Sequence, residues 1–243
     1  MMGLDKGVGF NRNIKLEWLD AAAAFCLEID DPKAIRARLE LVLAQDRSGK
    51  DAIRKSIDIL INIWLKNREN YPGLYQQAAT LYQATMIPTD RLWLHYGLTM
   101  LYFPFFRDCA AAIGQLSRYE DTITNRIVID KMIGEMGHLG SLERSAQRVV
   151  ASLRDWGILT DSGEANAYVP QYRTFTASRP ELERWLLSCA LHAHPVEQLP
   201  FADLLHLPAL FPFKFTVTVY DLSQADEFEV QRQGMGMDMV RAV

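Results

Sequence analysis

The sequence predicts a mainly α-helical protein with three parts: a helical N-terminal body, a winged helix-turn-helix module and a C-terminal β-hairpin packed on helices. In residues 11–116, apolar side chains recur at helical spacing between capping residues and prolines. Residues 122–169 run as a helix, a glycine-containing turn, a second helix and two ribbons, the order of a winged helix. Residues 213–220 and 227–233 alternate apolar and polar side chains, as half-buried strands do. The expected units are residues 1–117, 118–179 and 180–243.

Start signals divide the first unit into short helices. Asp31 precedes Pro32, and this pair is a strong helix start because aspartate caps free backbone N–H groups while proline has none to cap. Further caps are expected at Asn11 or Asn13 and near Ser48. We find no repeat and no obvious linker here, so we expect a single all-helical body.

The most apolar stretch of the chain, from Leu92 to Phe106, needs to be tested as a membrane span. It has 15 residues, whereas a span needs ~20. Pro104 and the charged residues that follow close it off. We therefore expect a buried core helix and no membrane contact. His95 lies within this stretch and is expected to be a hydrogen-bonded core histidine rather than a catalytic base.

Two helices joined by a tight turn form the predicted helix-turn-helix, and Ser141 is placed to cap the second one. The core-facing side of that second helix is expected to comprise Leu142, Ala146, Val149, Val150, Leu153 and Trp156. The side chains expected to face solvent are Glu143, Arg144, Ser145, Gln147, Arg148 and Arg154. Two ribbons follow, and the turn between them, near residues 162–166, would be the tip of the wing.

The last unit begins with a helix and is expected to end in a hairpin. Pro180 opens the helix and Pro195 stops it. Residues 213–220 and 227–233 supply the two strands of the hairpin. Because a bare hairpin is marginally stable in water, we expect it to pack on the helices.

Charge limits the classes of partner. The formal net charge is −4 and the sequence pI is about 5.8, which argues against a generally basic nucleic-acid binder. Residues 1–60 contain ten basic and ten acidic side chains, and residues 118–179 contain eight of each. Residues 180–243 contain four basic and nine acidic ones. Any DNA contact must therefore come from a local patch, and the acidic last quarter favours a basic partner.

Signatures of enzymes are weak. Gly49 and Lys50 lack both the earlier glycine and the following hydroxyl residue of a phosphate-binding loop. His192 and His194 would lie about 200° apart on a helix and would not converge on one metal ion. The three cysteines are far apart, without a CxxC pair, and no signal peptide is recognised, which favours a reducing cytoplasm. We expect a non-enzymatic cytoplasmic protein with no cofactor and no metal.

Arg144 and Arg148 belong to the most informative group of residues. They are four residues apart, with Ser145 and Gln147 at adjoining positions, so one helical face would present two guanidinium groups and two hydrogen-bonding groups. Arginine reads guanine and glutamine reads adenine, each with roughly 1–3 kcal/mol of discrimination. Residues of the wing would reach phosphates or a minor groove. The candidate DNA-binding residues are Ser141, Arg144, Ser145, Gln147, Arg148, Asn166, Tyr168 and Arg173.

Protein docking is the alternative use of the same module. Winged helices also serve as docking units, and four carboxylates dilute the basic face: Glu143, Asp155, Asp161 and Glu164. The chain would then be a scaffold or adaptor for a larger ATPase, nuclease or methyltransferase, without direct DNA contact. The DNA preference, the protein partners and self-association into a homo-oligomer stay open.

The layout of three motifs resembles a bacterial defence family. FNRNIKLEWLD lies near the start, SAQRVVASLRDWGIL lies late in the middle and FEVQRQG lies near the end. This layout is similar to that of the BrxA-like accessory proteins of bacterial phage-defence (BREX-type) systems, most clearly over residues 110–170. The resemblance implies a small, largely helical protein that binds double-stranded DNA among other proteins of an antiviral complex. It carries over only to the outer face of the second helix, at Arg144, Gln147 and Arg148.

Overall fold

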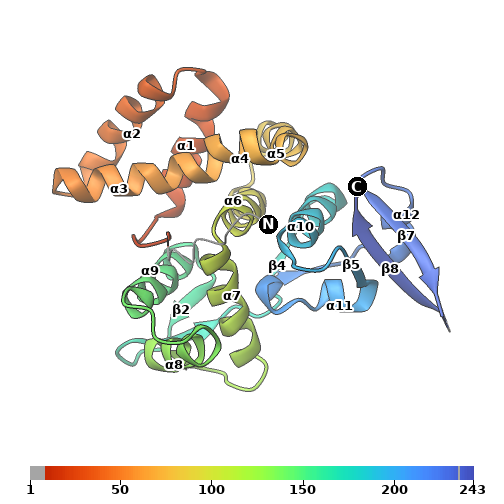
Figure 1. The fold of residues 1–243 in the computed structure, drawn as a ribbon. Coiled ribbons are helices and arrows are strands. Elements are labelled where there is room, and N and C mark those ends of the chain that lie inside the picture. Colours follow the sequence, from red (N-terminus) through yellow and green to blue (C-terminus); the bar gives the residue numbers. More distant parts are fainter. Residues whose placement is uncertain (1–8, 235) are drawn as a thin grey trace.

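Apolar side chains at helical spacing fold the first half of the chain into packed helices. The computed structural model describes residues 9–234 and 236–243 and is mainly helical, with three small sheets (Figure 1). The start of the chain, on which the expectation about a signal peptide rests, falls in residues 1–8 and lies outside the described residues. The first half contains α1 (Leu16–Glu28), α2 (Pro32–Asp46), α3 (Lys50–Ile61), the π-helical turn η1 (Asn62–Lys66), α4 (Asn67–Asn70), α5 (Pro72–Ala84), α6 (Pro88–Tyr102) and α7 (Pro104–Leu116).

Helix starts follow the predicted signals only in part. Asp31 caps α2 as predicted, because its carboxylate accepts hydrogen bonds from two backbone N–H groups at 3.0 and 3.3 Å. The caps expected at Asn11 or Asn13 and near Ser48 are wrong, since neither α1 nor α3 has a side-chain cap. The Asn13 amide instead donates to Asp155, far along the chain. A tertiary contact has replaced the local one.

The central element of the fold is α6. Figure 1 shows α6 in the middle of the molecule, with α1–α5 above it, α7 below it and α10 beside it. Every residue from Leu92 to Leu101 is buried, and α7 begins at Pro104 directly after α6 ends. The predicted core helix is therefore confirmed. Within the described ranges, no helix combines the length and apolarity that crossing a bilayer requires.

Two helices and an antiparallel sheet follow α7. They are α8 (Asn125–Met136) and α9 (Leu142–Asp155), with β1 (Ile123–Thr124), β2 (Leu159–Asp161) and β3 (Ala167–Pro170). The strand order is β1–β3–β2, so the strand that precedes α8 pairs with the last strand of the group. Gly137 ends α8 with a φ of 77°, a left-handed conformation that favours glycine. The predicted core-facing side chains of α9 are all buried, which confirms that part of the pattern.

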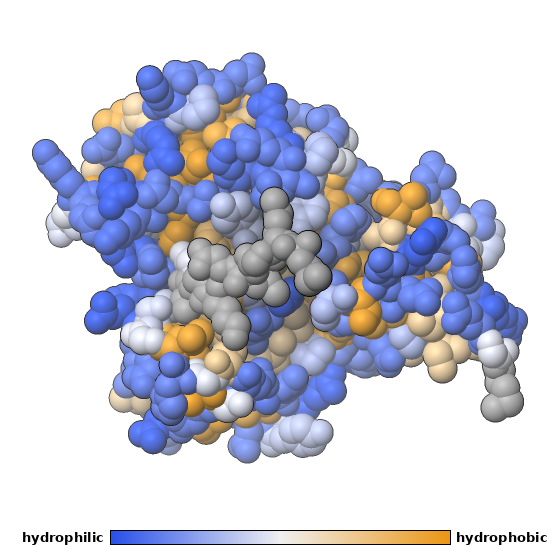
Figure 2. All heavy atoms as spheres, in the orientation of Figure 1, coloured by the Kyte–Doolittle hydropathy of each residue, from blue (hydrophilic) through white to orange (hydrophobic). Residues whose placement is uncertain are grey.

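The last quarter of the chain combines helices with short strands. Its helical elements are α10 (Pro180–Ala193), α11 (Phe201–Leu205), the 3-10 turn η2 (Pro208–Leu210) and α12 (Val219–Ser223). Its strands are β4 (Phe175–Thr176), β5 (Gln198–Pro200), β6 (Phe213–Lys214), β7 (Phe228–Gln233) and β8 (Met237–Ala242). β6 pairs in parallel with β4, and β8 lies between β5 and β7. Figure 2 shows mainly hydrophilic side chains over this hairpin and over α3.

The strand predicted over residues 213–220 is wrong beyond its first two residues. The buried carboxylate of Glu183 on α10 accepts hydrogen bonds from the backbone N–H groups of Thr216 (2.6 Å) and Val217 (2.9 Å). These donors are therefore not free to join a sheet. Thr218 then forms a capping box that starts α12. The C-terminal hairpin exists, but it joins β7 to β8.

A polar network in the core holds His95 in its neutral form. The ring is fully buried; the indole N–H of Trp64 donates to Nδ1 (3.1 Å), and Oδ1 of Asp20 lies 3.0 Å from Nε2. Because Nδ1 accepts, the ring proton is on Nε2 and points to the carboxylate. Burial lowers the pKa of His95, and Asp20 offsets this only in part. Burial raises the pKa of Asp20, but the hydrogen bond with His95 and nearby positive charge outweigh it, so the net shift is downward.

We predict that the chain loses stability in mild acid through His95. A histidine whose pKa is lowered by folding contributes stability above its unfolded pKa of about 6.5, and this contribution is lost as the pH falls below that value. The free energy of unfolding in urea should therefore drop between about pH 7 and about pH 5, and His95→Gln should remove much of that drop. His138→Gln, in an exposed turn, should leave it intact. Equal pH dependence in the two variants would contradict the prediction.

Candidate nucleic-acid interface

The outer side of α9 presents the predicted basic face to solvent. Arg144, Gln147 and Arg148 are all exposed, as predicted. Neither arginine forms an ion pair in the part of the chain that the structure describes. Asp155 and Asp161, which were expected to dilute this face, lie 3.7 and 3.9 Å from a different cation, Arg154. The two guanidinium groups are therefore free to meet an anion.

A shallow hollow lies at the N-terminal end of α9. It is lined by His138, Leu139, Gly140, Glu143, Arg144 and Gln147. Ser141 is the N-cap residue and is exposed, but its side chain makes none of the capping hydrogen bonds that were predicted. The positive end of the helix dipole lies beside the Arg144 guanidinium at this hollow, and both attract negative charge.

Ser145 does not face solvent on α9 as predicted. Only 1% of this residue is exposed, so it does not reach a ligand in solvent and the prediction that it faces outward is wrong. Its position explains the burial: Ser145 lies three residues after Leu142 and four before Val149, on the side of α9 that packs into the core. Its small side chain fits where helix and core approach each other. The exposed face is thus narrower than predicted.

Two of the predicted DNA contacts, Asn166 and Tyr168, lie at or just after the turn between β2 and β3, and they differ in exposure. Asn166 is exposed at this turn, with a φ of 58°, and its carbonyl accepts a hydrogen bond from the backbone N–H of Asn125 (3.2 Å). Tyr168 is only 8% exposed, because alternation along β3 turns it towards the core and leaves Val169 outside. Burial withdraws most of Tyr168 from any ligand in solvent, whereas Asn166 is exposed.

Arg173 lies away from this turn. It follows β3 at the end opposite to Asn166, and its backbone, at a φ of 51°, donates to the carbonyl of Phe211 (2.9 Å). Its guanidinium carbon is 5.5 Å from the centre of the Tyr172 ring. The side chain is exposed, but it belongs to the loop that leads to β4. The prediction that it belongs to the second ribbon is wrong, because β3 ends at Pro170.

Hydrogen bonds from residues 13 and 14 hold the inner side of α9; we call this contact the Asn13 clamp. The Asn13 amide donates to Asp155 (2.8 Å), and Ser152 Oγ accepts from the backbone N–H of Ile14 (2.8 Å). The Trp156 indole donates to the Ile14 carbonyl (2.8 Å). The partners are separated by 138 to 142 positions along the chain. No sequence signal indicated this contact.

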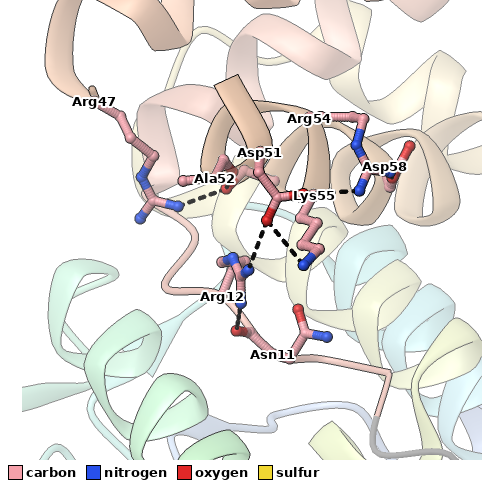
Figure 3. Close-up of polar contacts among 9 residues, drawn as sticks. Asn11, Arg12, Arg47, Asp51, Ala52, Arg54, Lys55 and Asp58 are labelled. Atoms are coloured by element: carbon pink, nitrogen blue, oxygen red, sulfur yellow. Dashed lines mark hydrogen bonds and ion pairs between the residues drawn. The ribbon is translucent and has the colours of Figure 1, made fainter. Parts of the chain in front are cut away.

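Two further arginines, Arg12 and Arg47, lie near the Asn13 clamp. Figure 3 shows both, with Arg12 directed towards Asp51 on α3. Arg47 follows α2 and donates through Nη2 to the Asn13 carbonyl (3.2 Å). Arg12 reaches the first turn of α3, where its Nη2 is 3.9 Å from Asp51. Burial lowers the pKa of Arg47, and the positive charges of Arg12 and Arg148 lower it further. Arg148 on α9 therefore lies near Arg47, a cation that the sequence pattern did not indicate.

Comparisons of the chain with protein-family models, with curated proteins and with solved structures find no match. Among residues 9–234 and 236–243, no three His, Cys, Asp or Glu side chains are grouped as a metal ion requires. The chemistry that the exposed groups offer is the binding of anions by guanidinium groups and hydrogen bonding by one amide.

We predict that the exposed face and the clamp differ in their effect on stability. Arg144→Ala combined with Arg148→Ala should change the free energy of unfolding by less than about 0.5 kcal/mol, because both side chains are exposed and unpaired. Ser152→Ala should lower it by about 1–3 kcal/mol, because it leaves the buried N–H of Ile14 without an acceptor. Urea unfolding measures both. A large loss in the arginine variant would show that these side chains serve the fold.

Proposed function

We propose that residues 104–170 form a winged helix and that its α9 binds double-stranded DNA. The order of elements supports this: α7, β1, α8, α9 and a two-stranded turn follow one another, with the strands in the order β1–β3–β2. In such a module the second helix of the helix-turn-helix enters the major groove. The first helix of the module would be α7, which lies ahead of the segment from residue 118 that the sequence pattern delimits.

The observation that carries the proposal is the pair of unpaired arginines on α9. Arg144 and Arg148 are one helical turn apart and project from the same side of the helix. On α8 the exposed Arg126 pairs with Asp130 at 2.9 Å, whereas neither Arg144 nor Arg148 has a carboxylate partner among the described residues. Two guanidinium groups without such a partner match the spacing and charge of a nucleic-acid ligand.

The same face offers the groups needed to distinguish bases. Glutamine exchanges two hydrogen bonds with adenine, so Gln147 would read a base edge, while Arg144 and Arg148 would pair with phosphates beside the groove that α9 enters. Asn166, at the exposed turn between β2 and β3, would contact a phosphate or the neighbouring groove. Ser141, exposed at the start of α9, would contact the backbone of the duplex.

The biological setting we propose is a bacterial anti-phage defence complex in the cytoplasm, in which this chain is a non-enzymatic DNA-binding component. The resemblance to BrxA-like proteins suggests this setting. A net charge of −4 makes DNA affinity weak for the isolated chain. Other proteins of the complex would raise the effective concentration of α9 at DNA without new contacts.

One feature favours the adaptor function as the second candidate. A hollow of about 680 Å³ lies where α4, α5 and α10 meet the C-terminal residues. Its lining includes Asp226 and Glu227 but no lysine or arginine among its residues. It would fit a basic segment of a larger protein. If duplex DNA does not bind, this candidate takes precedence.

We predict that the chain binds duplex DNA with an affinity that falls steeply with salt. Each phosphate contact contributes roughly 0.9 to the slope of log affinity against log salt, so Arg144→Ala with Arg148→Ala should reduce the slope by about two. Fluorescence anisotropy over a range of salt concentrations measures it. Gln147→Ala is the matched control, because removing a neutral side chain should weaken binding without changing the slope. Absent or salt-independent binding by the unmodified chain would refute the proposal.

A further inference from the structure

The Asn13 clamp brings cations from three separate elements to one place. Arg148 lies on α9, Arg47 on the loop after α2, and Arg12 on the segment before α1. Ser152 links them: its Oγ donates to Oδ1 of Asn13 (3.3 Å) and its position on α9 is one turn from Arg148, whose carbonyl lies 3.0 Å from that Oγ. Arg47 bonds to Asn13 and Asn13 contacts Ser152, so Arg47 and Arg148 lie on either side of the same clamp.

Arg47 has no carboxylate partner among the described residues. It is held by neutral acceptors, through Nη1 to Ser56 Oγ (2.6 Å) and Nη2 to the Asn13 carbonyl, and its guanidinium carbon is 5.0 Å from the centre of the Trp18 ring. These contacts fix its position without neutralising its charge. An arginine that is partly buried, oriented and unneutralised is arranged to receive an anion.

The carboxylates nearby are already engaged by other groups. Asp51 lies between three cations, with Arg54 at 2.9 Å, Lys55 at 2.8 Å and Arg12 at 3.9 Å (Figure 3). Asp46 is bonded to Lys15 (3.1 Å).

Asp155 accepts from the Asn13 amide and lies near Arg154. None of these carboxylates neutralises Arg47 or Arg148, so positive charge remains in surplus beside the clamp. The lowered pKa of Arg47, caused by burial and then by Arg12 and Arg148, agrees with that surplus.

We propose that the DNA bound by α9 continues across the Asn13 clamp, where Arg12 and Arg47 contact phosphates of the same duplex. This inference rests on the proposed function of α9. A duplex carries one negative charge per ≈1.7 Å of its axis, so it can meet cations on α9 and on the helical body together. Because Arg12 and Arg47 contact phosphates rather than bases, they add affinity without sequence preference.

The test is the salt dependence of binding to a mixed-sequence duplex of two helical turns, about 21 base pairs. Arg12→Gln with Arg47→Gln should reduce the slope of the log–log plot by about two. Arg12→Gln alone should reduce it by about one, and this variant removes no contact of Arg47 with Ser56 or Trp18. Thermal unfolding of each variant verifies that the chain is folded.

The matched control is Arg38→Gln with Arg68→Gln, which removes the same charge at the opposite end of α1. These arginines are exposed and pair with Glu28 and Asp30. The control should keep the slope of the unmodified chain. A control that loses as much slope as the Arg12 and Arg47 variant would overturn the inference, because the effect would then be one of net charge alone.

Comparison with the α9 variant separates the two proposals. If Arg144→Ala with Arg148→Ala lowers the slope but the Arg12 and Arg47 variants do not, the further inference is wrong and α9 remains the DNA contact. If only the Arg12 and Arg47 variants lower the slope, the role proposed for α9 is wrong while the arginines beside the clamp do bind DNA. Absence of duplex binding by the unmodified chain overturns both.

Discussion

The hydrogen bonds between residues 13–14 and α9 are the constraint on which the exposed basic face depends. They engage Ser152, Asp155 and Trp156, all in the C-terminal half of the helix or just beyond it. Two of them satisfy backbone groups of Ile14, which is itself fully buried, and leaving such groups unpaired costs about 1–3 kcal/mol each. These bonds fix the direction of α9, while on its outer side Arg144 and Arg148 stay exposed.

Local signals predicted the elements whose environment is simple. The Asp31 and Pro32 start of α2, the apolar core helix α6 and the apolar stripe of α9 needed only capping chemistry and helical spacing, and each is confirmed. The alternation over residues 213–220 was misleading because a buried carboxylate, Glu183, captures the backbone donors that a strand would use. Nothing near that segment in the sequence indicates that α10 supplies an acceptor. The order β1–β3–β2 likewise depends on pairing between distant segments.

In the candidate site, too, local signals predicted some features and distant contacts determined the others. Exposure of Arg144, Gln147 and Arg148 followed from the period of one helix. The burial of Ser145 did not follow from helical spacing. A serine at the edge of an apolar stripe is compatible with either side of the helix, and packing decides between them. The approach of Arg12 and Arg47 to α9 could not be predicted, since it depends on hydrogen bonds of Asn13 with residues 34 and 142 positions away, Arg47 and Asp155. Periodicity describes one element at a time, whereas this surface is assembled from three.

The position of β8 has a consequence for how the chain is made. β8 lies between β5 and β7, so neither of these strands has its sheet partner until the chain has been synthesised past residue 237. At the usual pace of translation, the stretch between β5 and β8 takes roughly 2–7 s to emerge. During that interval the β5 backbone offers an unpaired edge to any other nascent chain nearby. Arrival of β8 pairs this edge of β5 and the facing edge of β7 in one step.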